Sequence, residues 1–571
     1  MIHLCIEEKL QAAVRAVLPD ADASRIWVRP CPDLQHGDYQ TNALMALAKQ
    51  QRRNPRELAT AVVAQLDVTP WCARVEIAGP GFLNFHLAPH AINAALQEAL
   101  GTGHSFFKKA TTPRTIVIDF SSPNVAKPMH VGHIRSTILG DALARVFRLL
   151  GHRVITDNHI GDWGTQFGML LVGWKTLLDA ATLERDPIAE MERLYQAINL
   201  AAKEDERIRE QARAELVKLQ SGDAENLGIW RRMLELSQSQ FDNVYGRLGI
   251  QFDHTLGESF YNDQLGAVLA ELARAGIAEE SDGALVVFFR DHATMNDNPA
   301  IIRKSDGAAN YASTDLATLR HRVEQWQAQE ILYVTDGRQQ LHFQQVFTIY
   351  QRWHPQMTAR LEHVWFGSIL GPDGKPFKTR EGGVVKLAAL LDEAEERALT
   401  AVTQKNPDLD EATRREIARA VGLGALKYAD LSNNRQSDYT FDWDKMLALQ
   451  GNTAPYLQYA CTRVRSIFRK GEVADLSGAT IALAAPQELA LAKRLLNFGI
   501  ALETVAAEYR PNYLCNYLYE LAGDFTAFYE ACPVLKAGDA ERQSRLALCK
   551  LTGQVLHEGL GLLGIEVPEK M

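Results

Sequence analysis

The segment from Thr115 to Ser136 constrains the fold of this chain more than any other. The apolar run Thr115-Ile-Val-Ile ends at Asp119, as in a parallel strand that is buried on both faces. Residues 121–124 (Ser-Ser-Pro-Asn) then have the composition of a turn, and from Ile134 apolar residues recur at helical spacing. A strand, a polar turn and a helix in this order predict one unit of a parallel α/β sheet.

The predicted helix opens on His130-Val131-Gly132-His133, in which two histidines flank a glycine. The glycine lets a ligand approach the backbone, and the histidines add donors where free N–H groups and the helix dipole already favour an anion. This pattern predicts a phosphate site, although HxGH alone also fits two surface histidines beside a turn glycine. The polar residues nearby favour the phosphate site over this alternative. They are Asp119, Asn124 and Lys127, and burying so many polar groups where a strand meets a helix would be unfavourable unless they face a ligand.

The composition is that of a soluble globular chain of several domains, with 571 residues, 46% hydrophobic and 23% charged. No apolar run approaches the ~20 residues that span a bilayer, and charged residues at 7–9 interrupt any secretory segment. Seven scattered cysteines without a CxxC pair indicate a reducing, cytoplasmic location, and neither zinc nor disulfides. With a net charge of −9, any contact with nucleic acid must use local basic surfaces.

Three domains are predicted along the chain. Residues 1–108 form a small α+β domain, with helices at 7–18 and 55–66 and two strands about the turn at 79–81. Residues 109–383 alternate strands and helices, with a charged helical arm inserted at about 186–250 and a hairpin around 305–307. Further strands of the parallel sheet are predicted at 153–158, 285–289, 331–335 and 363–369. Residues 384–571 are all-α, with helices at 385–404, 411–428, 488–507 and 546–559.

Six motifs lie in order along the chain. They are SSPNVAKPMHVGHIRST (121–137), DNHIGDWGTQFG (157–168), YASTDLA (311–317), RQQLHFQQVF (338–347), GPDGKPFKTREGG (371–383) and GNTAPYLQYACTRVRSI (451–467). Together they resemble the class I aminoacyl-tRNA synthetases, and specifically the bacterial arginyl-tRNA synthetases. The resemblance implies a Rossmann-like catalytic core, an N-terminal domain that contacts the tRNA D-loop, and a C-terminal helical bundle that binds the anticodon.

By this resemblance, His130 and His133 stabilise the charge that develops when the arginine carboxylate attacks the α-phosphate of ATP. Gly132 makes room for the adenine and ribose. The second phosphate element of the class, a lysine-rich loop, here reads PFKTR at 376–380 and lacks its first lysine.

Lys127 is expected to compensate for that missing lysine. Together, Lys127 and Lys378 would neutralise the pyrophosphate leaving group, and Thr379 would also bind ATP. A flexible glycine-rich hairpin with ordinary surface lysines remains the alternative for residues 371–383.

A guanidinium requires planar, bidentate acceptors. Tyr311 and Asp315 share one helix face at i, i+4 spacing, and by resemblance they bind the guanidinium. The rest of the arginine site is assigned to Asp119, Ser121, Asn124 and Gln339, where Asp119 replaces the glutamate of other members. A helix N-cap or a solvent-facing carboxylate remains the alternative for Asp315.

The resemblance also implies contacts with tRNA. Phe82 and Asn84 match the strand that meets the D-loop, where an aromatic beside an amide suits an unpaired base. The anticodon-binding residues are expected to be Tyr456, Arg463, Tyr529 and Met571. For each of these residues, core packing or a solvated face remains the alternative.

The resemblance therefore predicts an arginine–tRNA ligase. It would form arginyl-adenylate from arginine and ATP and transfer arginine to the 3′-terminal adenosine of tRNA, with tRNA bound before activation. ATP would bring Mg²⁺, no residue is assigned to a metal, and a monomer without membrane contact is expected. Alternatives are another HxGH nucleotidylyltransferase, a synthetase for cysteine or lysine, and an inactive RNA-binding relative. The Tyr311–Asp315 pair and the lack of zinc ligands argue against cysteine, and the retained histidines against inactivity.

Overall fold

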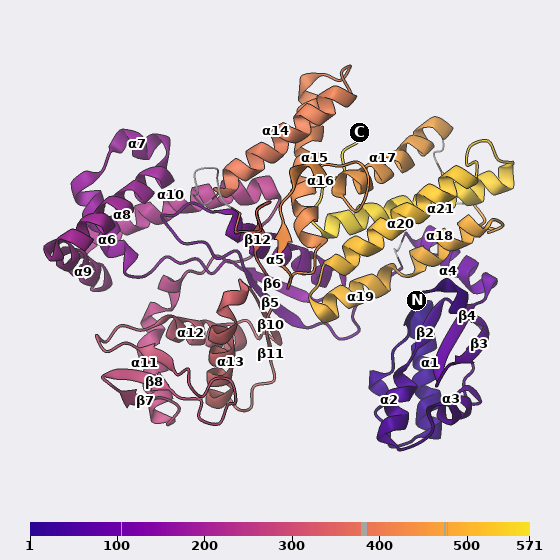
Figure 1. The fold of residues 1–571 in the computed structure, drawn as a ribbon, viewed down its shortest axis with the longest axis horizontal. Helices are drawn as coiled ribbons and strands as arrows, with labels where there is room; N and C mark the ends of the chain where they lie inside the picture. Colours follow the sequence, from indigo (N-terminus) through magenta and orange to yellow (C-terminus); the bar gives the residue numbers. More distant parts are fainter. Residues whose placement is uncertain (104–105, 378–384, 473–474, 477) are drawn as a thin grey trace. The chain divides into compact units, whose positions relative to one another are not determined.

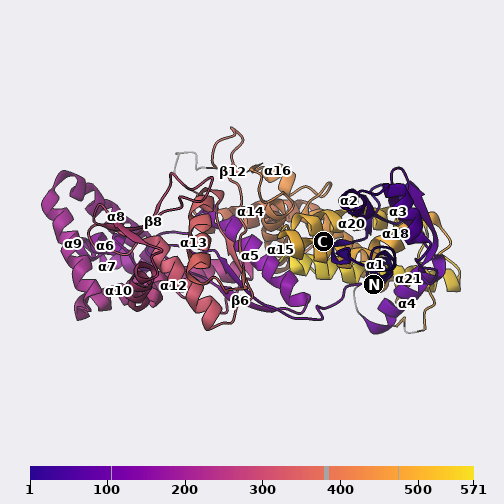
Figure 2. The ribbon, with the colours of Figure 1, turned by 90° about the horizontal axis from the view of Figure 1, so that it is seen from below.

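The computed structural model describes residues 1–103, 106–377, 385–472, 475–476 and 478–571. The chain forms two units, which can be followed by sequence colour in Figure 1 and Figure 2. Unit 1 contains Met1–Lys109, Ala448–Leu562 and Glu566–Met571, and unit 2 contains Ala110–Leu447 and Leu563–Ile565. The first and last parts of the chain therefore share unit 1, and the histidine segment lies in unit 2.

Unit 2 is built on a four-stranded parallel sheet in the order β11-β10-β5-β6. Its strands are β5 (Thr115–Phe120), β6 (Arg153–Asp157), β10 (Glu330–Val334) and β11 (Arg360–His363). Helix α5 (Val131–Leu149) packs closely on the sheet at Gly140, where a Cβ atom would lie 2.1 Å from Cγ of Phe120. On the sheet, Val117 and Ile331 join one apolar core with α12 (Tyr311–Glu324) and α13 (Gln340–Trp353).

One of the predicted parallel strands has other partners, and another has other bounds. The run at 285–289 forms β8 (Ala284–Val287) in a separate antiparallel sheet with β7 (Glu279–Ser281) and β9 (Ala300–Arg303). The reason is the two-residue turn at 282–283, whose residues both have positive φ and join β7 to β8 as a hairpin. The run at 363–369 divides between β11 and the short β12 (Ile369–Leu370), which pairs with β13 (Tyr439–Thr440).

The predicted helical arm of unit 2 is a group of helices that lie together in both views (Figure 1; Figure 2). The helices are α6 (Gln166–Leu177), α7 (Ala180–Arg185), α8 (Pro187–Glu204), α9 (Glu206–Gln220) and α10 (Ala224–Leu248). An aspartate side chain caps the start of each of the last four, which explains why one charged stretch folds as several separate helices. The remaining helices of unit 2 are α11 (Asn262–Arg274), α14 (Leu387–Lys405), α15 (Glu411–Leu431) and α16 (Trp443–Met446).

Unit 1 combines an antiparallel sheet with two sets of helices. The sheet has the order β1-β2-β4-β3, with β1 (Arg29–Pro30), β2 (Tyr39–Thr41), β3 (Cys72–Ala78) and β4 (Phe82–Leu87). The N-terminal helices are α1 (Ile2–Val17), α2 (Ala43–Gln50), α3 (Pro55–Val63) and α4 (Pro89–Thr102). The C-terminal helices are α17 (Ala454–Gly471), α18 (Pro486–Leu496), α19 (Phe498–Glu508), α20 (Asn512–Ala531) and α21 (Asp539–Leu562). The single helix predicted at 488–507 is thus two helices that meet at Asn497.

These elements confirm the predicted fold class: a parallel-sheet core, an α+β N-terminal part and a helical C-terminal part. The domain boundaries at 108 and 384 stay predictions. Within the described ranges, no helix is both long enough and apolar enough to cross a membrane.

Candidate functional site

The loop between β5 and α5 is held in a strained backbone conformation. Ser121 has φ of 74° and Ala126 has φ of 62°, a region that costs a non-glycine residue about 1–3 kcal/mol. Side chains from other elements fix the loop there. The Ser121 N–H donates to Oγ of Ser136 (2.8 Å), and the Ala126 N–H donates to Oγ of Ser237 (3.0 Å). The Ser121 hydroxyl lies 2.8 Å from the hydroxyl of Tyr245, which is a third contact that holds the loop in this conformation.

His130 and His133 cap the start of α5 reciprocally. The Gly132 N–H donates to Nδ1 of His130 (3.0 Å), and the His130 N–H donates to Nδ1 of His133 (3.1 Å). Burial and the charge of Arg338 lower the pKa of His130, and burial lowers the pKa of His133 to about 3. Both rings are therefore neutral near pH 7, and since each Nδ1 accepts a hydrogen bond, each proton resides on Nε2. The pair presents two Nε2–H donors at a helix N-terminus, as a phosphate site requires.

The environment of Lys127, and a cation that acts on His130, are seen in the described part of the chain. The Lys127 ammonium lies 5.3 Å from the ring centroid of Tyr195, on α8. Arg338 was not predicted from the sequence; its guanidinium forms two hydrogen bonds with Asp336, of 2.8 and 3.0 Å, and its charge reaches His130. Lys378 and Thr379 lie outside the described residues.

Asp119 and Asn124 occupy different environments at the end of β5. Asp119 is buried, and its Oδ2 accepts a hydrogen bond from Arg322 at 2.7 Å. The same Arg322 nitrogen donates to Asp157 at the end of β6, also at 2.7 Å, so one buried guanidinium joins two strand ends. Asn124 is exposed, as is Gln339 at the end of the short helix that follows β10. The carboxyl ends of three adjacent strands therefore meet at one edge of the sheet.

Tyr311 and Asp315 lie at the start of α12. Tyr311 is 70% exposed, and Asn310, not Asp315, occupies the N-cap position. The Asp315 carboxylate instead forms a 2.6 Å hydrogen bond with Nε2 of His342 on α13. Burial lowers the pKa of His342, but the hydrogen bond and charge of Asp315 raise it, and the net shift is upward. His342 was not predicted, because nothing in its spacing links it to Asp315.

Glu258 is a second carboxyl group in this region that the sequence did not indicate. Burial raises its pKa to about 7, and the charges of Asp162 and Asp315 add to the effect. His159 and the backbone N–H of Trp163 oppose the rise. Crowded, half-buried carboxyl groups of this kind fit a cationic ligand, which would favour their charged forms.

The predicted D-loop residues lie on β4 of unit 1. Phe82 is half-buried, whereas Asn84 is only 4% exposed. Oδ1 of Asn84 has no hydrogen-bond partner among the described residues. A contact of Phe82 with RNA needs no rearrangement, whereas Asn84 would first have to become accessible.

Arg463 and Tyr529 lie together in unit 1. The Arg463 guanidinium stacks over Tyr459 at 4.9 Å and over Tyr529 at 5.5 Å, and both tyrosines are 40% exposed. Tyr459 was not predicted, although it lies one helical turn before Arg463. Tyr456 lies 5.7 Å from Tyr519, centroid to centroid, as a second aromatic pair. These rings and the guanidinium form a surface on which bases can stack.

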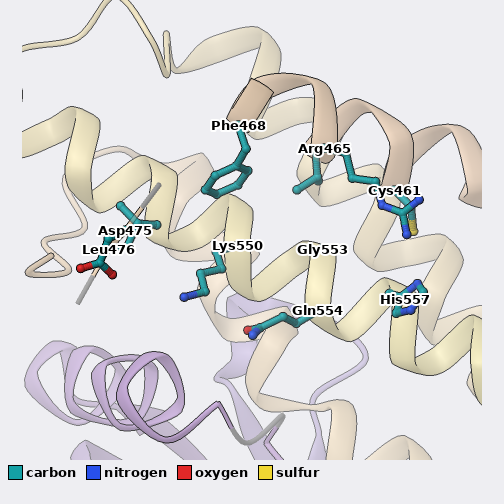
Figure 3. A pocket seen from close by; sticks show the side chains of 10 residues that line it. Cys461, Arg465, Phe468, Asp475, Leu476, Lys550, Gly553, Gln554 and His557 are labelled. Atoms are coloured by element: carbon teal, nitrogen blue, oxygen red, sulfur yellow. The ribbon is translucent and has the colours of Figure 1, made fainter. Parts of the chain in front are cut away.

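Arg465, from the same basic stretch, faces a different environment. It lines a cavity of about 490 Å³ between α17 and α21, together with Phe468 and Lys550 (Figure 3). Arg465, on α17, also donates to the carbonyl of Pro568 (2.8 Å). This hydrogen bond holds the C-terminal tail, which ends at Met571, against α17. Among the described residues, no group of three His, Cys, Asp or Glu side chains is arranged to hold a metal ion.

Three family models match the chain. The catalytic domain of class I tRNA synthetases for arginine matches residues 95–443. The DALR anticodon-binding domain matches residues 457–571, and the N-terminal domain of arginyl-tRNA synthetases matches residues 4–87.

Whole proteins match over their full lengths as well. An arginine–tRNA ligase of Chromobacterium violaceum is 47% identical over 577 residues, which cover 100% of both chains. One from Thermobifida fusca is 48% identical over 579 residues, which cover 99% of both. Among solved structures, the Plasmodium falciparum arginyl-tRNA synthetase has a TM-score of 0.84 at 29% identity, covering 100% of this chain and 99% of the other. The Thermus thermophilus arginyl-tRNA synthetase has a TM-score of 0.85 at 27% identity and covers 100% of both chains.

Proposed function

The chain belongs to the arginyl-tRNA synthetase family, and from this we propose that arginine and ATP react where the β5–α5 loop leaves the parallel sheet. The protein is an arginine–tRNA ligase, which forms aminoacyl-tRNA from arginine, ATP and tRNA. The observation that carries the proposed site is the reciprocally capped pair His130–His133 at the entrance of α5.

The activation step makes and breaks one bond to the α-phosphorus. The arginine carboxylate oxygen attacks, the bond to the bridging oxygen of the β-phosphate breaks, and pyrophosphate leaves with that electron pair. The Nε2–H groups of His130 and His133 donate to the α-phosphate oxygens as charge accumulates there. Since both rings stay neutral, they bind the developing charge without giving up a proton.

The leaving group needs cations. Lys127 and Lys378 would bind the β- and γ-phosphates together with Thr379, and Arg338 adds a charge beside His130. ATP would arrive with Mg²⁺ bound to its own phosphates. In the second step, the 3′-terminal adenosine of tRNA attacks the arginyl carbonyl and AMP leaves.

Arginine selectivity is assigned to the carboxyl groups at the start of α12 and in the segment before α11. Asp315 would accept the guanidinium and Glu258 would balance the rest of its charge, beside the ring of Tyr311. Asp119, Ser121, Asn124 and Gln339 would hold the ammonium and carboxylate ends. Lysine would leave part of this acceptor set unpaired, since an ammonium has no planar fork.

We assign tRNA binding to unit 1, which contains both ends of the chain. Phe82 and Asn84 would meet the D-loop, and Tyr456, Arg463, Tyr529 and Met571 would meet the anticodon. The domain of residues 1–108 would then contact the D-loop, the domain of residues 109–383, with its inserted helical arm, would catalyse the reaction, and the domain of residues 384–571 would bind the anticodon. We propose a cytoplasmic monomer that activates arginine only with tRNA bound.

The test is a charging assay with the full chain, in which tRNA, arginine and ATP are each omitted in turn. Pyrophosphate exchange is screened over all amino acids in the presence of tRNA. Among the amino acids, we expect only arginine to support charging and pyrophosphate exchange. We expect His133→Ala to lower turnover about a hundredfold, whereas the control His557→Ala in unit 1 leaves turnover unchanged. Exchange stimulated by cysteine or lysine, or tRNA binding without charging, would contradict the proposal.

A further inference from the structure

Asp157, at the end of β6, is a buried carboxylate to which the proposed reaction assigns no role. It is 0% exposed, and the register of the parallel sheet places it beside Asp119 at the end of the neighbouring strand β5. Two adjacent carboxylates repel each other, and burying a carboxylate away from water is unfavourable unless it is paired. Stability alone therefore does not explain a second acid next to the one assigned to the ammonium group of arginine.

A single nitrogen of Arg322 links the two carboxylates. Nη2 donates to Oδ2 of Asp119 and to Oδ2 of Asp157, both at 2.7 Å. The Arg322 side chain is completely buried, and its guanidinium lies 5.2 Å from the ring centroid of Tyr333. Nε of Arg322 is buried without a hydrogen-bond partner among the described residues. The two acids are therefore the anions that balance this cation, which is closed off from solvent.

Three titratable side chains beside this cluster are neutral near pH 7. Burial lowers the pKa of His321, and the charge of Asp157 only partly opposes that effect. Burial raises the pKa values of the Tyr261 and Tyr333 hydroxyls. Two carboxylates and one guanidinium therefore leave the cluster with one net negative charge. Without Asp157 the guanidinium would neutralise Asp119, and the cluster would carry no net charge.

Asp119 is the member of the cluster that can meet a ligand. It is 4% exposed, whereas Asp157 and Arg322 are completely buried. Its second oxygen, Oδ1, accepts a hydrogen bond at 3.0 Å from the hydroxyl of Ser122, which lies half-buried on the β5–α5 loop. A carboxylate oxygen accepts more than one hydrogen bond, so Oδ1 can also receive an N–H of an ammonium group. The net negative charge is thus available to a ligand through Asp119.

We propose that Asp157 is a positioning residue for arginine, which neutralises Arg322 so that Asp119 keeps a full negative charge for the α-ammonium group. Arg322 fixes the direction of the Asp119 carboxylate, and Asp157 offsets the positive charge that comes with this contact. When arginine binds, its α-ammonium group brings the buried cluster to zero net charge. A derivative without that group leaves the charge unbalanced, so the cluster selects for a free α-amino group. This inference rests on the contact between Asp119 and the ammonium group proposed above.

The test is Asp157→Asn, with the full chain assayed in the presence of tRNA. Asparagine keeps the shape of the side chain but removes its charge, and Arg322 then pairs with Asp119 alone. We expect KM for arginine to rise about tenfold, as for the loss of one charge-assisted interaction, while KM for ATP stays within twofold. Guanidinopentanoate, which is arginine without its α-amino group, serves as the probe. Its inhibition constant should agree within twofold between the variant and the unchanged protein, because it has no ammonium group.

Glu488→Gln is the matched control in unit 1, since it also turns a buried carboxylate into an amide beside an arginine, Arg545, at 2.7 Å. We expect this control to lower thermal stability without changing KM for arginine. Arg322→Lys tests the charge separately, and it also serves if Asp157→Asn does not fold. A lysine nitrogen carries three donors, so it can reach both carboxylates as Nη2 does, and KM for arginine should stay within threefold. A tenfold rise in Arg322→Lys would show that shape rather than charge matters, and would overturn the inference.

A double-mutant cycle with Asp119→Asn separates this inference from the role of Asp119 itself. If Asp157 acts through Asp119, Asp157→Asn raises KM for arginine at most twofold further in the Asp119→Asn background. An undiminished tenfold effect there, or an equal loss of guanidinopentanoate binding in Asp157→Asn, would overturn the inference and leave the role of Asp119 intact. If Asp119→Asn alone leaves KM for arginine unchanged, the proposed contact with the ammonium group fails, and the inference fails with it.

Discussion

The proposed active site in unit 2 and the proposed tRNA-binding surface in unit 1 use charged residues in opposite ways. In unit 2, Arg322 and Asp119 are buried, their partners are fixed, and the adjoining loop is strained at Ser121. In unit 1, Arg463 lies over two tyrosines that are each 40% exposed, and its guanidinium donates to the hydroxyl of Tyr459 at 3.4 Å. Phosphoryl chemistry needs donors whose positions are set in advance, whereas base stacking needs accessible faces that adapt.

This contrast predicts that variants of the two units affect different substrates. A substitution at the edge of the parallel sheet removes a group that several neighbours hold in place, so we expect a large change in kcat/KM for arginine or ATP. A change on the tRNA surface removes one of several similar contacts, so the effect is small and confined to tRNA. The three experiments below run from the largest expected effect to the smallest.

Asp315→Ala is expected to have the largest effect. The variant removes the acceptor that we propose for the guanidinium and also leaves His342 without its 2.6 Å partner. We expect kcat/KM for arginine to fall by about a thousandfold, or about 4 kcal/mol, with KM for ATP within twofold. Charging kinetics with each substrate varied in turn measure both. The exposed N-cap variant Asp410→Ala is the control and changes neither value; equal losses for arginine and ATP would contradict the guanidinium assignment.

Glu258→Gln should have opposite effects on stability and on arginine binding. The pKa of this carboxyl group is about 7 in the folded protein, above its ordinary value of 4.5. The folded state therefore holds the proton more tightly than the unfolded state, so stability decreases as pH rises from 4.5 to 7. At pH 8 the buried charge destabilises the protein, and we expect Glu258→Gln to raise the free energy of unfolding by about 1–2 kcal/mol after allowance for solvent screening.

The same variant should weaken arginine binding about tenfold at pH 8, because a carboxylate that balances the guanidinium is lost. Thermal unfolding at pH 5 and pH 8 and KM for arginine at pH 8 are the measurements. The stability gain should be much smaller at pH 5, where Glu258 is protonated in the folded state. Glu393→Gln, on the exposed surface of α14, serves as the control. A gain in stability with unchanged KM would show that Glu258 lies outside the arginine site.

How far the sequence predicts the site depends on how far apart its parts lie along the chain. His130 and His133 were predicted correctly as a pair at the entrance of a helix, because strand, turn and cap are all encoded within one short segment. Glu258, His342 and Arg338 were missed, since they come from separate segments that only the folded chain brings near Asp315 or His130. Local spacing carries no information about such neighbours.

The same limit applies to the fold. The apolar run at 285–289 correctly predicted a strand, but hydrophobicity does not specify a partner, and the turn at 282–283 paired it within a hairpin. The helix expected at 488–507 breaks at Asn497, although its apolar periodicity continues on both sides. The residue type of Asn84 suits an unpaired base, but the packing of β4 determines that this side chain is buried.

Arg463→Ala tests the smallest effect, in unit 1. Without the guanidinium, the stacked arrangement with Tyr459 and Tyr529 loses its cation and one favourable contact with the RNA backbone or bases. We expect KM for tRNA to rise about fivefold and the slope of tRNA affinity against salt concentration to fall by about 1, while KM for arginine and for ATP stays constant. Arg397→Ala is the matched control, since it removes an arginine that stacks over Trp443 at 5.2 Å in unit 2. Two results would contradict the assignment of tRNA binding to unit 1 and of catalysis to unit 2. The first is an equal rise in KM for tRNA in both variants. The second is a change in KM for arginine in Arg463→Ala, because a stacking contact in unit 1 would then affect the reaction at the edge of the parallel sheet.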